Sequence, residues 1–455
     1  MNLPSPPESN TTRRAFLAAG AALGLAGCGG GGGTPAPAPV PAIDSLSAEP
    51  VAVGDAARIT AVFSGGAGRI EPDVGAVTSG VPAVTPRLAG PRAFTLVVQA
   101  PGQPALRREL WVRPSYRDRY VALPESPWLQ YHAAVAAPDG AVIVIGGSRG
   151  LGVLSDAIDR FDPTTRRFTR IGTMYTGRSL HSATPLPGGK ALVAGGQVGL
   201  TNGGFAELVD LGTGAVEAAG WPVRPRSFHA ACALDDGRVV LVGGFDDDTV
   251  ELWDPATRRF RLVAARMHNR REWPTATRLA DGRVLIVGGS HTAEAQRLAE
   301  VFDPRTETFE PVASPLDGER RSLHAAHLMP DGRVLVLGGE VHTAAGLMPL
   351  DTALRFDPAT QSLAVDGRLG TARTVVRSVL LPDGIVRLFG GQAPDEPALR
   401  TAEAYPPGLA QPRLLAPMPA ARGWHTLTPL PDGRVLILGG DDAGGQPVMT
   451  ALLYE

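Results

Sequence analysis

The sequence has few cysteines, few lysines and almost no excess of charge. Cys28 and Cys232 are its two cysteines, Lys190 is its one lysine, and the formal net charge at pH 7 is −2 over 455 residues. A chain without a basic surplus cannot neutralise a polyphosphate backbone, which excludes nucleic acid as a main partner. Apolar residues at 44% and charged residues at 19% are typical of a globular protein.

The N-terminus carries an apolar stretch, Ala15–Gly27, that is too short to span a bilayer as a permanent helix. The preceding TRRAFL, with Arg13 and Arg14, resembles the twin-arginine export motif, and the closing LAGC resembles a lipobox that ends on Cys28. The resemblance implies that residues 1–27 are a signal peptide and that Cys28 is lipidated after cleavage. The alternative is an ordinary signal peptide with a chance cysteine.

Lipidation determines the expected location. Fatty chains on Cys28 hold a protein firmly at a membrane. Gly29 stands where lipoproteins of this kind that stay at the inner membrane carry an aspartate, so we expect the outer membrane of the cell envelope. Residues 28–42, CGGGGGTPAPAPVPA, have the composition of an extended tether. Cys232 is then the one remaining thiol, and no intramolecular disulfide is expected.

Residues 43–114 alternate short apolar runs with Gly and Pro turns. We predict strands at Ala57–Phe63, Phe94–Val98 and Leu106–Val112. Strands of this length in so short a segment favour a small β-sandwich. The stretch SLSAEPVAVGDAARITAVFSGGAG resembles immunoglobulin-like modules of bacterial surface lipoproteins, and the resemblance implies a spacer.

One repeat governs the rest of the chain. A Gly-Gly pair closes an apolar run at seven places, with first glycines at positions 146, 195, 243, 288, 338, 390 and 439. Seven residues before each pair begins a two-residue turn such as Asp139-Gly140, which suits a tight hairpin. In four repeats an Asp-Pro pair, such as Asp162-Pro163, marks a second turn. Each repeat therefore predicts four antiparallel strands.

Four strands in about 45–50 residues match a propeller blade. The segments HAAHLMPDGRVLVLGG (324–339) and AEVFDPRT (299–306) resemble parts of the kelch repeat. This resemblance implies an all-β chain with a seven-bladed kelch-type β-propeller over residues 115–455, an architecture that galactose oxidase and its relatives share. The last repeat lacks a fourth strand, and Arg119–Pro124 has the pattern of one. Residues 115–125 should therefore close the last blade, which removes an exposed sheet edge.

Loops between the second and third strands differ in every repeat, whereas the other turns are short and uniform. Binding residues gather on variable loops that a rigid scaffold carries, so the face with these loops, called the variable face below, is the expected binding face. The loops are residues 148–154, 197–204, 245–248, 290–298, 340–351, 392–400 and 441–449.

Basic side chains recur near the start of the first strand of each repeat. His132, His181, His229, His324 and His425 stand fourteen residues before a Gly-Gly pair, and Arg178, Arg226, Arg271, Arg321, Arg373 and Arg422 stand three residues earlier still. One interpretation is a ring at the channel mouth that binds an anion or a metal. The other is internal bonding, with arginines paired to the third-strand residues Glu207, Glu251, Glu300 and Glu403. The second is favoured because every blade needs the same internal bonds.

An aromatic residue precedes the recurring histidine position in four repeats: Tyr131, Phe228, Trp273 and Trp424. Side chains that reach the variable face there would stack on sugar rings. Side chains that point between blades would be core, which is the more common place for apolar strand residues.

These features predict a monomeric, membrane-anchored binding or scaffold protein of the bacterial cell envelope, whose partner is a protein or a glycan. The alternative is a copper-containing carbohydrate or alcohol oxidase, because Tyr131-His132 resembles the adjacent Tyr-His pair of the galactose oxidase copper site. The cysteine that crosslinks to tyrosine in that family has no evident counterpart here, since Cys232 lies eleven residues before its Gly-Gly pair. No catalytic motif or metal-ligand cluster stands out, so neither catalysis nor a cofactor is expected.

Overall fold

The computed structural model describes residues 39–127, 129–150, 152–199, 201–289, 297–343, 346–406 and 411–455. Its regular elements are all strands. Among the described residues there is no helix with the length and apolar character needed to cross a membrane. The export motif, Cys28 and tether residues 28–38 lie outside the described ranges.

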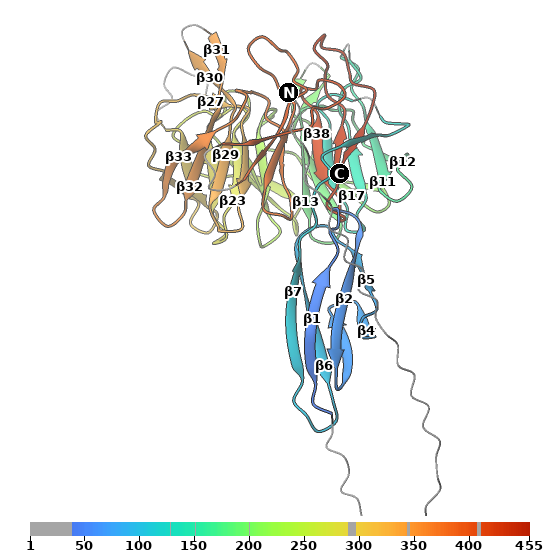
Figure 1. The fold of residues 1–455 in the computed structure, drawn as a ribbon. Coiled ribbons are helices and arrows are strands. Elements are labelled where there is room, and N and C mark those ends of the chain that lie inside the picture. The colour runs from blue at the N-terminus through green and yellow to red at the C-terminus, as the bar shows by residue number, and fades with distance from the viewer. Residues whose placement is uncertain are drawn as a thin grey trace, which may run out of the picture.

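The N-terminal part is a sandwich of two antiparallel sheets, ordered β1-β2-β5 and β4-β3-β6-β7 (Figure 1). The strands are β1 (Ala42–Ala48), β2 (Ala56–Ser64), β3 (Ala67–Glu71), β4 (Gly75–Val77), β5 (Ala83–Arg87), β6 (Arg92–Gln99) and β7 (Leu106–Val112). Alternate residues such as Ile59 of β2 and Phe94 of β6 point inward and share one core. The three predicted strands coincide with β2, β6 and β7 because their period-two pattern is local.

Seven four-stranded antiparallel sheets follow, numbered here in chain order. Sheet 1 consists of β9 (Ala133–Ala136), β10 (Val142–Ile145), β11 (Ala157–Asp162) and β12 (Arg167–Thr173). Sheet 2 consists of β13 (Ser182–Leu186), β14 (Lys190–Ala194), β17 (Glu207–Asp210) and β18 (Val216–Ala218). Sheet 3 consists of β19 (Ala230–Ala233), β20 (Val239–Val242), β21 (Val250–Asp254) and β22 (Arg259–Leu262). Sheet 4 consists of β23 (Thr275–Arg278), β24 (Val284–Val287), β25 (Ala299–Asp303) and β26 (Thr308–Pro311).

Sheet 5 consists of β28 (Ala325–Leu328), β29 (Val334–Leu337), β32 (Thr352–Asp357) and β33 (Ser362–Arg368). Sheet 6 consists of β34 (Ser378–Leu380), β35 (Val386–Phe389), β36 (Ala402–Tyr405) and β37 (Arg413–Leu415). Sheet 7 consists of β38 (Thr426–Pro429), β39 (Val435–Leu438), β40 (Leu452–Tyr454) and β8 (Tyr120–Ala122). Two small ribbons pair β15 (Gln197–Val198) with β16 (Thr201–Asn202), and β27 (Arg321–Ser322) with β30 (Glu340–Thr343) and β31 (Gly346–Pro349).

The sheets stand side by side (Figure 1), and the contacts between them close a ring. The first strand of each sheet contacts the first strand of the next, and β38 of sheet 7 contacts β9 of sheet 1. β8 pairs antiparallel with β40, with Val121 opposite Leu453, so the segment ahead of sheet 1 supplies the outer strand of sheet 7. A closed ring of four-stranded sheets is the propeller architecture.

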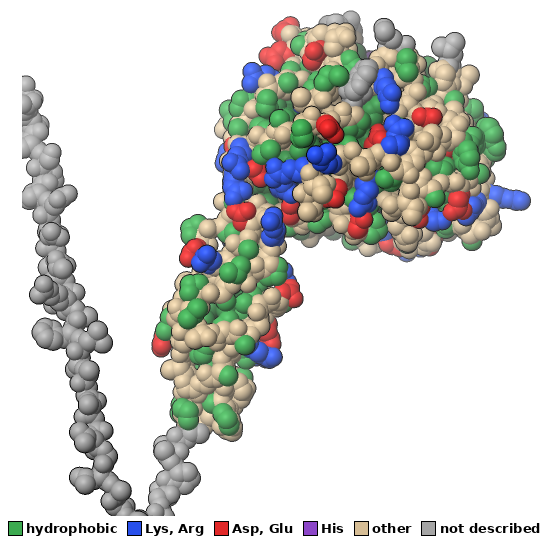
Figure 2. Space-filling view, turned by 90° about the vertical axis from the view of Figure 1, so that its right-hand side faces the viewer, with side chains coloured by type: hydrophobic (Ala, Val, Ile, Leu, Met, Phe, Trp, Pro, Cys, Tyr) green, Lys and Arg blue, Asp and Glu red, His purple; other side chains and the backbone are tan. Residues whose placement is uncertain are grey.

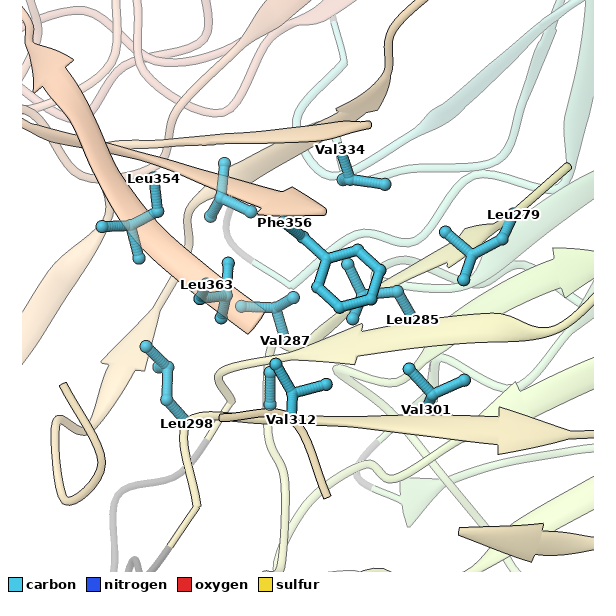
Figure 3. Close-up of a cluster of buried hydrophobic side chains, with 12 residues drawn as sticks. Leu279, Leu285, Val287, Leu298, Val301, Val312, Val334, Leu354, Phe356 and Leu363 are labelled. Atoms are coloured by element: carbon cyan, nitrogen blue, oxygen red, sulfur yellow. The ribbon is translucent and has the colours of Figure 1, made fainter. Parts of the chain in front are cut away.

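A separate hydrophobic cluster lies between each pair of neighbouring sheets. The second strand of each sheet is buried on both faces, as in β29, whose residues VLVL are all buried. Between sheets 4 and 5, Leu285 and Val287 meet Val334 and Phe356 (Figure 3). Continuous apolar runs form these strands because a strand between two sheets has no solvent face.

The sandwich lies against the face that carries the turns between first and second strands. Gly90 lies against Pro382 beside the sheet 6 turn, and the hydroxyl of Tyr116 donates to the carbonyl oxygen of Gly433 in the sheet 7 turn at 2.9 Å. Hairpin β30–β31 extends from the opposite end of the ring (Figure 1). The variable face therefore points away from the sandwich. On the side drawn in Figure 2, cationic and anionic side chains are interspersed over both parts, as the near-zero net charge suggests.

Candidate functional site

The recurring arginines form an internal layer. Each of the six is fully buried, with at most 1% of its surface exposed. Each donates to the carbonyl oxygen of the first glycine in the Gly-Gly pair of its own sheet, for example from Arg226 to Gly243 at 2.6 Å and from Arg321 to Gly338 at 2.9 Å. The other four bonds of this kind join Arg178 to Gly195, Arg271 to Gly288, Arg373 to Gly390 and Arg422 to Gly439. These arginines hold the end of the second strand.

Four of the six arginines also pair with the predicted third-strand glutamates: Arg178 with Glu207 at 2.6 Å, Arg226 with Glu251 at 2.5 Å, Arg271 with Glu300 at 2.7 Å, and Arg373 with Glu403. Arg321 pairs with Glu319 instead, and Arg422 donates to the hydroxyl of Thr450. The glutamates accept backbone N–H bonds from the connections between sheets, as Glu251 does from Val223 and Arg224. Internal bonding therefore accounts for the contacts of these buried arginines.

The recurring histidines bridge neighbouring sheets. Each ring lies against the first glycine of the preceding Gly-Gly pair; a Cβ added to Gly195 would come within 2.6 Å of Cε1 of His229. Three of them bond a hydroxyl of the preceding sheet through Nε2: His132 with Thr426 at 2.8 Å, His229 with Ser182 at 2.9 Å and His324 with Thr275 at 2.9 Å. Burial lowers the pKa of His132 to about 4 and those of His181, His229 and His324 to about 3, so the rings are neutral near pH 7.

The residue before the recurring histidine position is in the left-handed region in every sheet. The φ angles are 53° at Tyr131, 58° at Leu180, 59° at Phe228, 57° at Trp273, 53° at Leu323, 51° at Val375 and 57° at Trp424. Such angles are rare for bulky residues, so seven equivalent cases mark a conformation that the surrounding fold imposes. The sequence alone gave no signal for it, because none of the seven is Gly, Asn or Asp.

This backbone conformation brings four aromatic side chains together at the channel. The ring centroids of Phe228 and Trp273 lie 4.5 Å apart, those of Trp273 and Trp424 5.1 Å, and those of Trp424 and Tyr131 5.2 Å. All four are partly exposed and line a cavity in the middle of the ring. Their side chains therefore face the cavity. We call these four residues the aromatic cluster.

The cavity has a volume of about 490 Å³. The aromatic cluster, the five recurring histidines and residues of several inner strands line it, and so do His327 of β28 and Arg377, which precedes β34. The imidazole of His327 bonds the hydroxyl of Ser378 at 2.7 Å. Sequence reasoning missed both His327 and Arg377.

Arg377 departs from the repeat. The residue after the recurring histidine position is Ala133, Ser182, Ala230, Thr275, Ala325, Arg377 or Thr426, so sheet 6 alone places a large cation there. Its guanidinium carbon lies 5.8 Å from the ring centroid of Trp424. Burial lowers the pKa of Arg377 to about 10. Aligning the repeats at this position would have revealed it.

The described side chains are not arranged to bind a metal ion. Across the described ranges, no group of three or more His, Cys, Asp or Glu side chains is placed to hold a metal ion. Tyr131 points toward Asp441, with 3.5 Å between the hydroxyl and Oδ2, whereas His132 points between sheets and bonds Thr426. Cys232 is half-buried in β19, and burial raises the pKa of its thiol.

Comparisons with known proteins agree with the architecture. The kelch motif matches residues 131–175. An F-box/kelch-repeat protein of Arabidopsis thaliana is 30% identical over 123 residues, which are 26% of this chain and 32% of that protein. Adagio protein 3 of the same plant is 28% identical over 217 residues, covering 42% of this chain and 34% of that protein. The chain thus spans about a third of the length of these curated relatives.

A solved structure of a fungal alcohol oxidase of the AA5 family in complex with copper has a similar fold. Its TM-score is 0.59 at 14% identity, and the match covers 74% of this chain and 75% of that chain. At this identity the likeness concerns the fold alone. Copper is bound in that protein. Here the side chains of Tyr131 and His132 point in different directions, and the described residues form no cluster of metal ligands. These side chains therefore do not fit a copper centre of that kind. The expectation of an all-β kelch propeller is confirmed.

Proposed function

Because the chain folds as a kelch propeller, we propose that it is a binding or scaffold protein that holds a protein or a glycan on its variable face. In this proposal the propeller has seven blades, an immunoglobulin-like sandwich acts as a spacer, and a lipid on Cys28 anchors the chain to the outer membrane of the cell envelope after export through Arg13 and Arg14. The anchored protein is monomeric and needs no cofactor.

One observation carries the proposal: the sandwich occupies the face with the short turns and leaves the variable face free. Tyr116 and Gly90 hold the sandwich against turns of sheets 7 and 6. The chain leading to any anchor enters the sandwich from residue 39. The aromatic cluster and the loops are thus presented away from the anchor, and Leu347 and Met348 in hairpin β30–β31 are 56% and 52% exposed. These two exposed apolar side chains are available to contact a partner.

Site-specific photo-crosslinking in cells tests this orientation. A photo-reactive residue in place of Leu347, on the variable face, should trap a defined partner. The same residue in place of Trp111, which is 53% exposed on the sandwich, is the matched control and should trap little. If the partner is a glycan, crosslinking at position 347 stays low, but Trp424→Ala weakens retention on envelope glycans whereas Trp111→Ala does not. The proposal would be refuted if positions 347 and 111 crosslink equally and if Trp424→Ala and Trp111→Ala retain glycans equally.

Two further measurements test the anchor and the alternative. Cys28→Ser should release the protein from the membrane fraction if the cysteine carries the lipid. Metal analysis of natively exported protein should find no stoichiometric copper. Stoichiometric copper would overturn the binding proposal in favour of an oxidase, although no observed side-chain arrangement supports that function.

A further inference from the structure

We infer that the central cavity binds a small carboxylate, with Arg377 as its cationic anchor and the aromatic cluster as its apolar wall. This goes beyond the proposed function. The cavity shares Trp424 with the glycan form of that proposal, but the carboxylate depends on Arg377, which the loops do not use, so variants of Arg377 and of the loops distinguish the two.

The charge of Arg377 carries the inference. Among the described residues, its guanidinium has no carboxylate partner, and its Nε, which is buried from solvent, has no hydrogen-bond partner. Five of the six recurring arginines have a carboxylate partner. Arg226, for instance, meets both Glu251 and the Gly243 carbonyl, whereas Arg422 meets the Gly439 carbonyl and the Thr450 hydroxyl. Removing a cation from water costs free energy unless an anion pairs with it, so a bound anion would offset that cost. The described part of the chain therefore supplies no negative partner for Arg377.

A neutral, fully buried imidazole lies beside that cation. In three sheets the hydroxyl that bonds the Nε2 atom of a histidine comes from the residue equivalent to Arg377. Arg377 replaces that hydroxyl in front of His425, whose Nε2 has no hydrogen-bond partner within the described residues. Burial, with Arg377 and Arg422 nearby, lowers the pKa of His425 well below its usual value, so the ring is neutral. His425 itself is fully buried, so the partly exposed guanidinium of Arg377 is the group that would meet an anion in the cavity.

The size and the walls of the cavity define the rest of the ligand. A volume of about 490 Å³ is typical of sites for small molecules. The edge of the aromatic cluster lies next to Arg377, because Trp424 contacts both that guanidinium and Trp273. A ring or a short apolar body attached to the carboxylate would cover the aromatic faces and displace water from them. Two ligand classes fit, an acidic sugar and an aryl acid. They share the carboxylate and differ in the group attached to it.

Isothermal titration calorimetry on the full chain tests the inference with four probes: glucuronate and phenylacetate, and their uncharged counterparts glucose and phenylacetamide. At least one carboxylate should bind more tightly than its uncharged counterpart. Arg377→Thr should weaken that binding roughly tenfold to a hundredfold, the usual effect of losing a hydrogen bond to a charged group. Glucuronate as the better ligand identifies a sugar acid, and phenylacetate identifies an aryl acid.

Two controls separate binding from folding. Thr is the native residue at the equivalent position in sheets 4 and 7, so Arg377→Thr should keep the thermal unfolding temperature of the parent or raise it. Arg149→Gln removes an exposed arginine of the variable face and should leave binding unchanged. The inference is overturned if neither carboxylate binds at millimolar concentration, if the uncharged probes bind equally well, or if Arg377→Thr binds like the parent.

Discussion

The Nε2 atom of His324 lies 2.9 Å from the hydroxyl oxygen of Thr275, and the two residues stand at the inner ends of neighbouring sheets. One sheet further on, the equivalent pair is Val376 and Ala325, so both polar partners are absent together. Pro274 likewise follows Ala230 in the preceding sheet. Hydroxyl and imidazole thus occur together or are absent together at five of the seven interfaces, whereas His181 faces Ala133 and His425 faces Arg377 without a hydroxyl.

This pairing predicts a compensating double variant. His324→Val alone leaves the Thr275 hydroxyl without its partner, and Thr275→Ala alone does the same to the imidazole. Each should lower the free energy of unfolding by about 1–3 kcal/mol. The double variant, which reproduces the Ala325–Val376 interface, should lose at least about 1 kcal/mol less than the sum of the single losses. Chemical denaturation measures all three.

The matched control for this cycle combines His324→Val with Ser182→Ala. Ser182 bonds His229 at a different interface, so the two losses should add. Additive losses in the Thr275–His324 pair would contradict this coupling.

The neutral histidines predict loss of stability in acid. The folded pKa of His324 is about 3, below its usual value of 6.5, because burial disfavours the charged ring. Its stabilising contribution is complete above pH 6.5 and is lost as the pH falls toward 3, because only the unfolded chain takes up the proton in that window. Between pH 6 and 4.5 the parent should lose about 2 kcal/mol more than the Thr275→Ala/His324→Val double variant. Urea unfolding at the two pH values tests this, and equal losses in both proteins would contradict it.

The buried ion pairs predict a large cost for a nearly isosteric change. Glu251 accepts bonds from Arg226 and from the backbone N–H groups of Val223 and Arg224. Glu251→Gln keeps the shape but leaves the buried Arg226 with only the more distant carboxylate of Asp247, at 3.8 Å, and should cost about 3 kcal/mol of unfolding free energy. Glu307→Gln, which breaks the exposed pair with Arg261, should cost less than about 1 kcal/mol. Similar costs for the two variants would show that the internal pairs contribute little.

The Gly-Gly pairs predict a steric effect beyond backbone strain. Gly195 has a φ of +64°, and a Cβ there would come within 2.6 Å of the His229 ring. Gly152 has a φ of +75° and open space around the same position. Both alanine variants carry the left-handed strain of about 1–2 kcal/mol. Gly195→Ala should lose about 2 kcal/mol more because the carbonyl oxygen of Arg226, at 2.5 Å, and the imidazole must both move. Thermal unfolding of the two variants measures the difference.

Local patterns predicted much of the fold. Turn pairs such as Asp139-Gly140 and apolar runs such as VLVL in β29 specify strands through neighbours in sequence, and the recurrence of Arg226 and Glu251 in register indicated their pairing. The left-handed backbone at Trp424 was not predictable, because contacts with other sheets impose it on an ordinary residue. The isolation of Arg377 also depends on what the neighbouring sheets place around the channel, which one repeat read alone does not reveal.

The pairing of β8 with β40 has a consequence for the order of folding. Arg119 and Glu455, whose side chains meet beside these strands, are 336 positions apart. While the chain is being synthesised, sheets 1 to 6 can form and stack in succession, but β8 has no strand to pair with until residues 452–454 have been made. Ring closure is therefore the last event, and until then the incomplete arc has two open edges, where it is most exposed to pairing with another chain.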